Sequence, residues 1–130
     1  MSDIEETLEL RPHFEKRGGL IPCITQDALN GQVLMLGYVN QEALAETLDS
    51  GYATFWSTSR EELWTKGKTS GDLLELVEIL VDCDQDALIY KVKPLGSGAC
   101  HTKNKSSQAR RSCFYRVFKK DSDTLIHLEP

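Results

Sequence analysis

The fold is decided by residues 73–113, which read LLELVEILVDCDQDALIYKVKPLGSGACHTKNKSSQARRSC. Two apolar runs in it, residues 73–81 and 87–92, flank a short polar segment with three aspartates. Periodicity alone does not separate helix from strand in the first run. Because the second run follows a short turn and looks like its partner, we interpret both as strands of one hairpin.

Short elements are predicted on both sides of this hairpin. Apolar, β-branched or aromatic runs predict further strands at residues 20–25, 33–39, 52–57, 114–118 and 124–128. An Asn-Gly turn signal at residues 30–31 joins the first two of these into a hairpin. Asn40 can cap a helix over residues 41–48, which Gly51 would end, and residues 1–19 predict a helical lead-in.

Length and composition predict a single domain that spans residues 1–130, because 130 residues with 40% hydrophobic content form one core and are too few for two. The sequence shows no signal-peptide pattern and no apolar run near the roughly 18 residues that a membrane span needs. We therefore expect a cytoplasmic protein. In that reducing compartment, clustered cysteines favour metal ligation or nucleophilic chemistry over a disulfide framework.

The charge is unevenly distributed along an acidic chain. The formal net charge of −5 argues against general binding to nucleic acids or membrane surfaces. Residues 101–120 nevertheless contain no acidic residue. The basic residues in this segment are Lys103, Lys105, Arg110, Arg111, Arg116, Lys119 and Lys120. Such a patch fits a small anionic ligand, and a solvated loop explains the charge alone equally well.

The aspartates of the central stretch alternate along the chain. An extended backbone would project Asp82, Asp84 and Asp86 to one side and Cys83 to the other. Oxygen ligands favour Mg²⁺, whereas a thiolate favours Zn²⁺. An EF-hand is excluded because the required Gly and Glu are missing from the sixth and twelfth positions of the loop. An acidic turn in water fits this motif about as well as a magnesium site.

Three of the four cysteines are candidate zinc ligands. Cys83, Cys100 and Cys113 lack the paired spacing of zinc fingers and ribbons. Three thiolates from separated positions would leave the fourth tetrahedral position to water, whereas His101 as a fourth ligand would close the site. We favour three ligands plus water, with His101 as a nearby proton-transfer group. Cys23 lies in an apolar strand and is interpreted as a core residue.

The loop at residues 65–71, TKGKTSG, combines lysines, glycines and hydroxyl groups. Backbone N–H groups and ammonium charge in such a loop can cradle a phosphate. The spacing differs from that of a P-loop, and a mobile surface loop explains the composition as well.

Taken together, several ordered motifs identify a family. They are VLML at 33–36, FWSTSR at 55–60, LWTKGKTSG at 63–71, DCDQD at 82–86, ACHT at 99–102 and SCFY at 112–115. This set resembles phosphoribosyl-AMP cyclohydrolase, the ring-opening enzyme of histidine biosynthesis, over residues 19–116. The resemblance implies an α+β fold: a small mixed structure with few helices and a strongly bent, barrel-like sheet, in an intertwined homodimer.

The resemblance also implies a site and a reaction. Zinc ligands fall on Cys83, Cys100 and Cys113, shared between the two subunits, and magnesium ligands on Asp82, Asp84 and Asp86. The phosphorylated nucleotide substrate would meet Arg60, Trp64, Lys66, Lys68, Ser70 and Arg111. The reaction implied is hydrolytic opening of the N1–C6 bond of N1-(5-phosphoribosyl)-AMP by zinc-activated water with His101, the third step of histidine biosynthesis. Two departures stand out: Thr58 replaces an arginine, and the segment between Cys100 and Cys113 is longer than usual.

Three other functions remain open for this sequence. A non-catalytic, zinc-stapled dimerisation module would use the same cysteines with His101 as a fourth ligand. A zinc deaminase ranks low because its H-x-E and P-C-x-x-C signature is missing. A redox thiol switch would need no metal.

Overall fold

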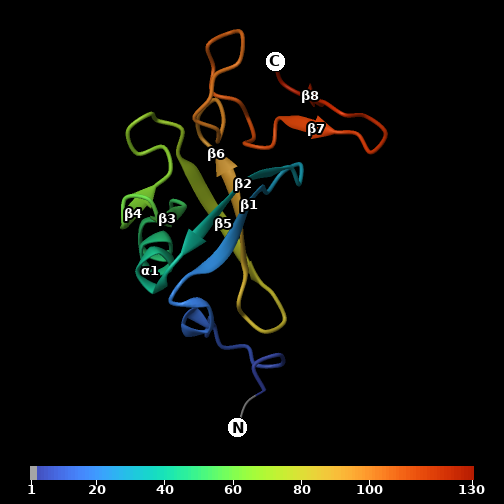
Figure 1. The fold of residues 1–130 in the computed structure, drawn as a ribbon. Helices are drawn as coiled ribbons and strands as arrows, with labels where there is room; N and C mark the ends of the chain where they lie inside the picture. Colours follow the sequence, from blue (N-terminus) through green and yellow to red (C-terminus); the bar gives the residue numbers. More distant parts are fainter. Residues whose placement is uncertain (1–2) are drawn as a thin grey trace.

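The structure, a computed structural model, describes residues 3–130 apart from the side chain of Arg17. Its strands are β1 (Ile21–Asp27), β2 (Val33–Val39), β3 (Thr54–Ser57), β4 (Glu62–Thr65), β5 (Leu74–Val81), β6 (Leu88–Pro94), β7 (Arg116–Phe118) and β8 (Leu125–His127). The main sheet has the order β2-β1-β6-β5, and the pairs β3-β4 and β7-β8 form two small sheets. Figure 1 shows the β7-β8 pair and the C-terminus at the end of the main sheet opposite the N-terminus.

The predicted α+β class is confirmed, but the barrel-like sheet is wrong. The described residues contain one α-helix and several separate sheets. Strands β2 and β5 are the two ends of the main sheet and do not pair with each other, so the sheet stays open. No helix within residues 3–130 is long and apolar enough to cross a membrane.

Both predicted hairpins are present. Strand β1 pairs with β2, and β5 pairs with β6, each in antiparallel register. The turn after β1 is stabilised by Asp27, whose Oδ1 accepts hydrogen bonds from the backbone N–H groups of Leu29 and Asn30. The two hairpins join through a parallel pairing of β1 with β6, which brings distant parts of the sequence into one sheet.

The predicted helix is α1 (Gln41–Ser50), and its ends follow the expected chemistry. The Oδ1 atom of Asn40 accepts a hydrogen bond of 2.8 Å from the backbone N–H of Ala43. Gly51 ends the helix with a φ of 82°, and its N–H donates to the carbonyl of Thr47. A residue without a Cβ adopts this left-handed conformation at little cost.

Replacing Asn40 with alanine should lower the free energy of unfolding by about 1 kcal/mol, because one backbone N–H at the start of α1 loses its acceptor. Urea unfolding of the two proteins measures the difference. Asn40→Asp is the matched control, since its carboxylate retains the acceptor and should keep most of the stability. Equal unfolding midpoints for the alanine variant and the unchanged protein would contradict this role of the cap.

The core joins the main sheet to the small β3-β4 sheet. Phe55 is fully buried and packs its ring 5.7 Å from both Tyr90 of β6 and Trp64 of β4. Gly37 of β2 makes room for this ring, because a Cβ there would lie 2.6 Å from the Phe55 Cδ1 atom. The core thereby fixes the position of β4 and of the loop that follows it.

The predicted N-terminal helix is wrong within the described residues, and residues 1–2 of that prediction lie outside them. Only a turn and the short 3₁₀ helix η1 (Phe14–Arg17) form there. Leu8 is fully exposed, so an apolar helical face would have nothing to pack on. The backbone N–H of Arg11 instead donates to the side chain of Gln85, which lies in the turn between β5 and β6.

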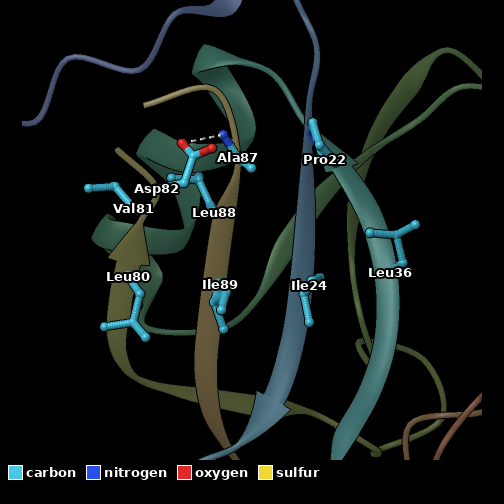
Figure 2. A pocket seen from close by; sticks show the side chains of 9 residues that line it. All are labelled: Pro22, Ile24, Leu36, Leu80, Val81, Asp82, Ala87, Leu88 and Ile89. Atoms are coloured by element: carbon cyan, nitrogen blue, oxygen red, sulfur yellow. Dashed lines mark hydrogen bonds between the residues drawn. The ribbon is translucent and has the colours of Figure 1, made fainter. Parts of the chain in front are cut away.

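One face of the main sheet is apolar and open. Ile24, Leu36, Leu80 and Ile89 come from four neighbouring strands and line a shallow cleft of about 380 Å³. Figure 2 shows these side chains side by side across the strands, with Asp82 at one edge. Buried residues alternate with exposed or half-buried ones along β1, so these side chains point away from the core.

Candidate active site

Most of the residues predicted to meet substrate line one cleft of about 330 Å³ beside β4. They are Arg60, Trp64, Lys66, Lys68, Ser70 and His101. The first five come from β4 and its flanking loops, whereas His101 comes from the far end of the main sheet. The fold therefore brings the predicted proton-transfer group to the predicted phosphate loop.

The loop after β4 is held in shape by backbone constraints. Gly67 has a φ of 82°, and a Cβ there would lie 2.1 Å from the carbonyl carbon of Asp72. The carbonyl of Gly67 accepts a hydrogen bond of 2.8 Å from the N–H of Gly71. These contacts mean that the loop is a packed turn with its lysines in defined places.

Positive charge dominates the cleft. Lys66 is 7% exposed, and its ammonium group lies 6.0 Å from the centre of the Trp64 ring. Arg60 pairs with Glu62 at 3.5 Å, but both side chains are solvent-exposed. Such a surface pair contributes little, so the guanidinium of Arg60 can turn to an anionic ligand. The cleft favours a small anion.

Cys100 and Cys113 lie together beside this cleft, near enough for each side chain to shift the pKa of the other. The N–H of Cys100 donates to the carbonyl of Arg110, and the N–H of Cys113 donates to the carbonyl of Leu34 in β2. The first bond closes the long loop between the cysteines, and the second attaches it to the main sheet. The longer spacing therefore does not separate the two sulfur atoms.

The two thiols differ in acidity. Burial raises the pKa of Cys100, but hydrogen bonds from the hydroxyl and the N–H of Thr102 outweigh it, with smaller effects from Cys113 and Arg110, so the pKa lies below its ordinary value. Burial and the neighbouring Cys100 raise the pKa of Cys113 to about 11, while the charge of Lys66 acts in the opposite direction. The surroundings therefore favour loss of the proton at Cys100 and its retention at Cys113.

Cys83 does not join this pair within one chain. It is exposed and lies in the turn before β6, whereas Cys100 follows the other end of that strand. Seven strand residues span roughly 20 Å, and Figure 1 shows the two ends on opposite sides of the sheet. Among residues 3–130, no group of three cysteines lies close enough to share an ion.

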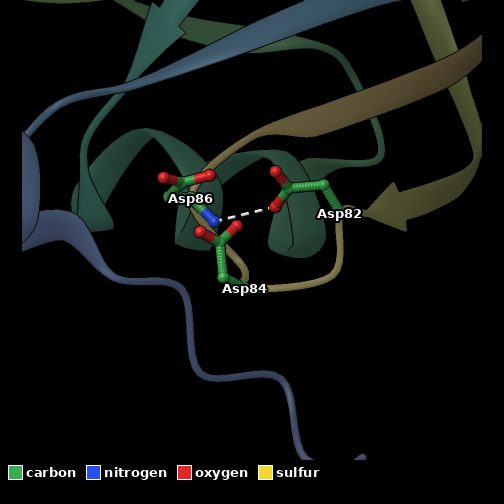
Figure 3. Close-up of side chains that lie close together, drawn as sticks. All are labelled: Asp82, Asp84 and Asp86. Carbon is green, nitrogen blue, oxygen red and sulfur yellow. Dashed lines mark hydrogen bonds between the residues drawn. The ribbon is translucent and has the colours of Figure 1, made fainter. Parts of the chain in front are cut away.

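The three aspartates gather, but not as an extended strand. Ligand atoms of Asp82, Asp84 and Asp86 lie within 4.8 Å of one another. Figure 3 shows the three carboxylates gathered on one turn. The segment is a turn in which Gln85 has a φ of 55°. Asp82 Oδ1 accepts hydrogen bonds from the N–H groups of Asp86 and Ala87, which folds the chain back on itself. The predicted clustering therefore holds, while the alternation argument behind it is wrong.

A lysine lies against this cluster. Lys16 Nζ pairs with Asp84 at 3.0 Å and with Asp86 at 2.8 Å. Hydrogen bonds to Asp86 and Asp84 raise the pKa of Lys16. Carboxylates at this separation repel one another, and in the described residues this ammonium group offsets part of that repulsion.

Arg111 lies apart from the cleft. Its guanidinium pairs with the buried carboxylate of Asp27 and donates a hydrogen bond of 2.8 Å to Gln32. These bonds hold the turn between β1 and β2. The sequence reasoning missed two residues, Thr102 and Arg110. Thr102 contacts the sulfur of Cys100 directly, and Arg110 donates a hydrogen bond to the hydroxyl of Thr102. The hydroxyl two positions after a candidate cysteine ligand was the available signal.

Comparison with known proteins agrees with the motifs. Residues 35–115 match the family model described as phosphoribosyl-AMP cyclohydrolase. The chain is 50% identical over 113 residues to a phosphoribosyl-AMP cyclohydrolase of Desulfatibacillum aliphaticivorans, covering 87% of this chain and 86% of that protein. A phosphoribosyl-AMP cyclohydrolase of Hyphomonas neptunium is 54% identical over 112 residues, covering 86% of this chain and 79% of that protein.

A further relative is a bifunctional histidine biosynthesis protein of Photobacterium profundum, 56% identical over 89 residues, which are 68% of this chain and 42% of that protein. The family match at residues 35–115 includes the residues that line the cleft. The ordered motifs predicted the same relationship. The chain therefore belongs to the phosphoribosyl-AMP cyclohydrolase family of enzymes.

Proposed function

We propose that this chain catalyses the hydrolytic opening of the adenine ring of N1-(5-phosphoribosyl)-AMP at the N1–C6 bond, in histidine biosynthesis. The single observation that carries the proposal is the basic cleft that holds His101 beside the paired Cys100 and Cys113. The printed names of relatives that cover most of the chain support it.

The cleft suits a substrate with two phosphates and a purine. Lys66 and Lys68 present ammonium groups from a constrained loop, and Arg60 adds a planar guanidinium at the rim. Trp64 presents an aromatic surface beside them, and Ser70 adds a hydroxyl group. Anionic groups of the substrate replace the weak contact between Arg60 and Glu62.

The cysteines fit zinc. Sulfur donors select this ion, and the hydrogen bonds from Thr102 that lower the pKa of Cys100 favour the thiolate form that binds a metal. Cys83, Cys100 and Cys113 would hold zinc, which would lower the pKa of a coordinated water and so supply a nucleophile at neutral pH. Cys23 does not fit, because it is fully buried in β1 and burial raises the pKa of its thiol.

The third sulfur comes from a second copy of the chain. Cys83 lies at the far end of β6 from the other two ligands, so one chain alone does not complete the set. The open apolar face of the main sheet is the surface on which the copies associate. Asp82 and Ala87 line the edge of that face, so an association there brings the turn with Cys83 to the interface. Two such sites form in one homodimer.

His101 moves the protons of the reaction. It takes a proton as the oxygen of water bonds to C6 of the substrate ring, and later returns it to N1 as the N1–C6 bond breaks. The second proton of the water passes to the exocyclic nitrogen, so that this nitrogen and the new oxygen on C6 form a carboxamide. Lys66 and Lys68 hold the phosphates, so that C6 stays within reach of the histidine.

The aspartate turn fits magnesium. Three carboxylates within 4.8 Å provide the hard oxygen ligands that Mg²⁺ takes, and Lys16 marks the same place as one that favours a cation. Asp82, Asp84 and Asp86 would hold the ion, and its positive charge would stabilise the phosphate groups of the substrate. Because Cys83 lies in this turn, the ion also stiffens the segment that carries the third sulfur.

Ring opening by purified, zinc-loaded protein tests the proposal. We expect a change in ultraviolet absorbance of the substrate, about one zinc per chain, loss of turnover after chelation, and recovery with zinc but not with magnesium alone. A folded, zinc-loaded protein that leaves the substrate intact would overturn the proposal and favour a structural zinc module. Turnover that persists after complete removal of zinc would overturn the role given to the metal.

A further inference from the structure

The sulfur of Cys100 receives hydrogen bonds that no step of the reaction uses. The hydroxyl oxygen of Thr102 lies 2.9 Å from Cys100 Sγ, and the backbone N–H of Thr102 donates to the same sulfur at 3.4 Å. Arg110 Nη1 donates to the Thr102 hydroxyl at 3.1 Å. Since a guanidinium is only a donor, the hydroxyl accepts from Arg110 and keeps its own proton available for a thiolate at Cys100.

Arg110 is itself fixed from two further sides. Its guanidinium stacks 4.1 Å from the centre of the Tyr115 ring, and Nε donates to the carbonyl of Glu129 at 2.7 Å. The ring of Tyr115 in turn stacks on His127 of β8 at 5.7 Å. A side chain held by a ring, a carbonyl and a hydroxyl keeps one rotamer, so Thr102 is held with it.

The C-terminal residues close the long loop around this arrangement. The carboxylate of Glu129 accepts a hydrogen bond of 2.9 Å from the side chain of Asn104 and another of 2.9 Å from the N–H of Arg111. The N–H of Lys105 donates to the carbonyl of Pro130. The hydrogen bonds from Arg111 and Asn104 lower the pKa of the Glu129 carboxyl group. Together with the Lys105 bond, they attach both arms of the loop to the end of the chain.

We propose that Thr102 and Arg110 are positioning residues that hold the Cys100 sulfur as a preformed metal ligand, and that the C-terminal residues keep them in place. This inference rests on the proposed function, because it assigns Cys100 to zinc. Partners one step removed from a metal typically change its affinity by about 10- to 100-fold. The network forms around the extra residues of this chain, and it explains why a longer loop still presents its cysteine in one orientation.

Thr102→Val tests the inference, since it removes the hydroxyl and keeps the shape of the side chain. We expect its zinc dissociation constant, measured by competition with a chromophoric chelator, to rise by about 10- to 100-fold. Thr102→Ser retains the hydroxyl and should keep the original affinity. Arg110→Gln should weaken zinc binding by about 10-fold. Arg116→Gln is its matched control, because Arg116 stacks 5.1 Å from the same Tyr115 ring and makes no contact with Thr102 among the described residues.

Unchanged zinc affinity in Thr102→Val and Arg110→Gln, in a protein that binds zinc and opens the ring, would overturn this inference and leave the proposed function standing. An unchanged chain that binds no zinc would overturn both. Thermal unfolding of each variant identifies a general loss of structure. If Thr102→Val does not fold, the zinc affinities of Arg110→Gln and Arg116→Gln test the inference instead. Equal zinc affinities in these two variants would contradict a role for Arg110 in holding Thr102.

Discussion

Cys100→Ala should yield a folded protein that retains no zinc and has lost ring-opening activity by about 10³-fold or more. The metal contributes several kcal/mol of charge stabilisation and a nucleophile, and each 1.36 kcal/mol corresponds to a factor of ten in rate. Metal analysis and the absorbance assay on one preparation measure both effects. The variant should still unfold cooperatively, because the core formed by Phe55 and Tyr90 lies apart from the cysteine pair.

Cys23→Ala is the matched control for this result. It removes the same sulfhydryl group from a position inside β1, so it should keep its zinc and its turnover despite some loss of stability. Equal loss of zinc in both variants would show that the metal depends on general stability. Full activity in zinc-free Cys100→Ala would remove the metal from the mechanism.

Mixing two inactive variants should restore activity if the site is shared between copies. In a dimer of one Cys83→Ala chain and one Cys113→Ala chain, one site has lost two of its three sulfurs and the other has kept all three. After purification through both tags every dimer is mixed and has one complete site of its two, so about half of the original activity per dimer should return. Co-expression with two different affinity tags, followed by the absorbance assay on the doubly purified dimer, measures it.

The pair Cys100→Ala with Cys113→Ala controls this experiment. Both changes fall on the part of the site that one chain supplies, so every mixed dimer lacks a ligand at each of its two positions. No activity should return. Recovery in this pair, or none in the first pair despite stable mixed dimers, would contradict the shared site.

Local chemistry explains which parts of the fold could be predicted. The cap at Asn40 and the left-handed Gly51 act within one or two turns of helix, so the sequence alone identified α1. The two hairpins follow from short turns in the same way. The last two strands are shorter than predicted, at Arg116–Phe118 and Leu125–His127, because strand ends depend on the partner.

Long-range pairing explains what could not be predicted. The parallel register of β1 with β6 joins residues that are far apart in the sequence, and no local pattern indicates it. A few apolar positions predict a helix in the N-terminal segment, but the backbone N–H groups of Arg11 and His13 bond to Gln85. Such contacts depend on where the turn between β5 and β6 lies in space.

The candidate site divides in the same way. Residue types and ordered motifs predicted the cleft around Lys66 and His101, because positive charge and a histidine suit the chemistry. Arg111 has the same charge, yet the carboxylate of Asp27 holds it at another turn. The three-dimensional structure is needed to distinguish Arg60, whose ion pair is solvent-exposed, from Arg111, whose partner Asp27 is buried.

The bonds to Gln85 constrain how this protein can be shortened or fused. Its side chain donates to the carbonyl of Glu9 and accepts from the N–H of Arg11, while its own carbonyl accepts from the N–H of His13. Trimming the chain to Gly18 would strip all three bonds from a nearly buried amide and loosen the aspartate turn. A purification handle at the amino end is therefore best placed before Glu9, where it leaves these three bonds in place.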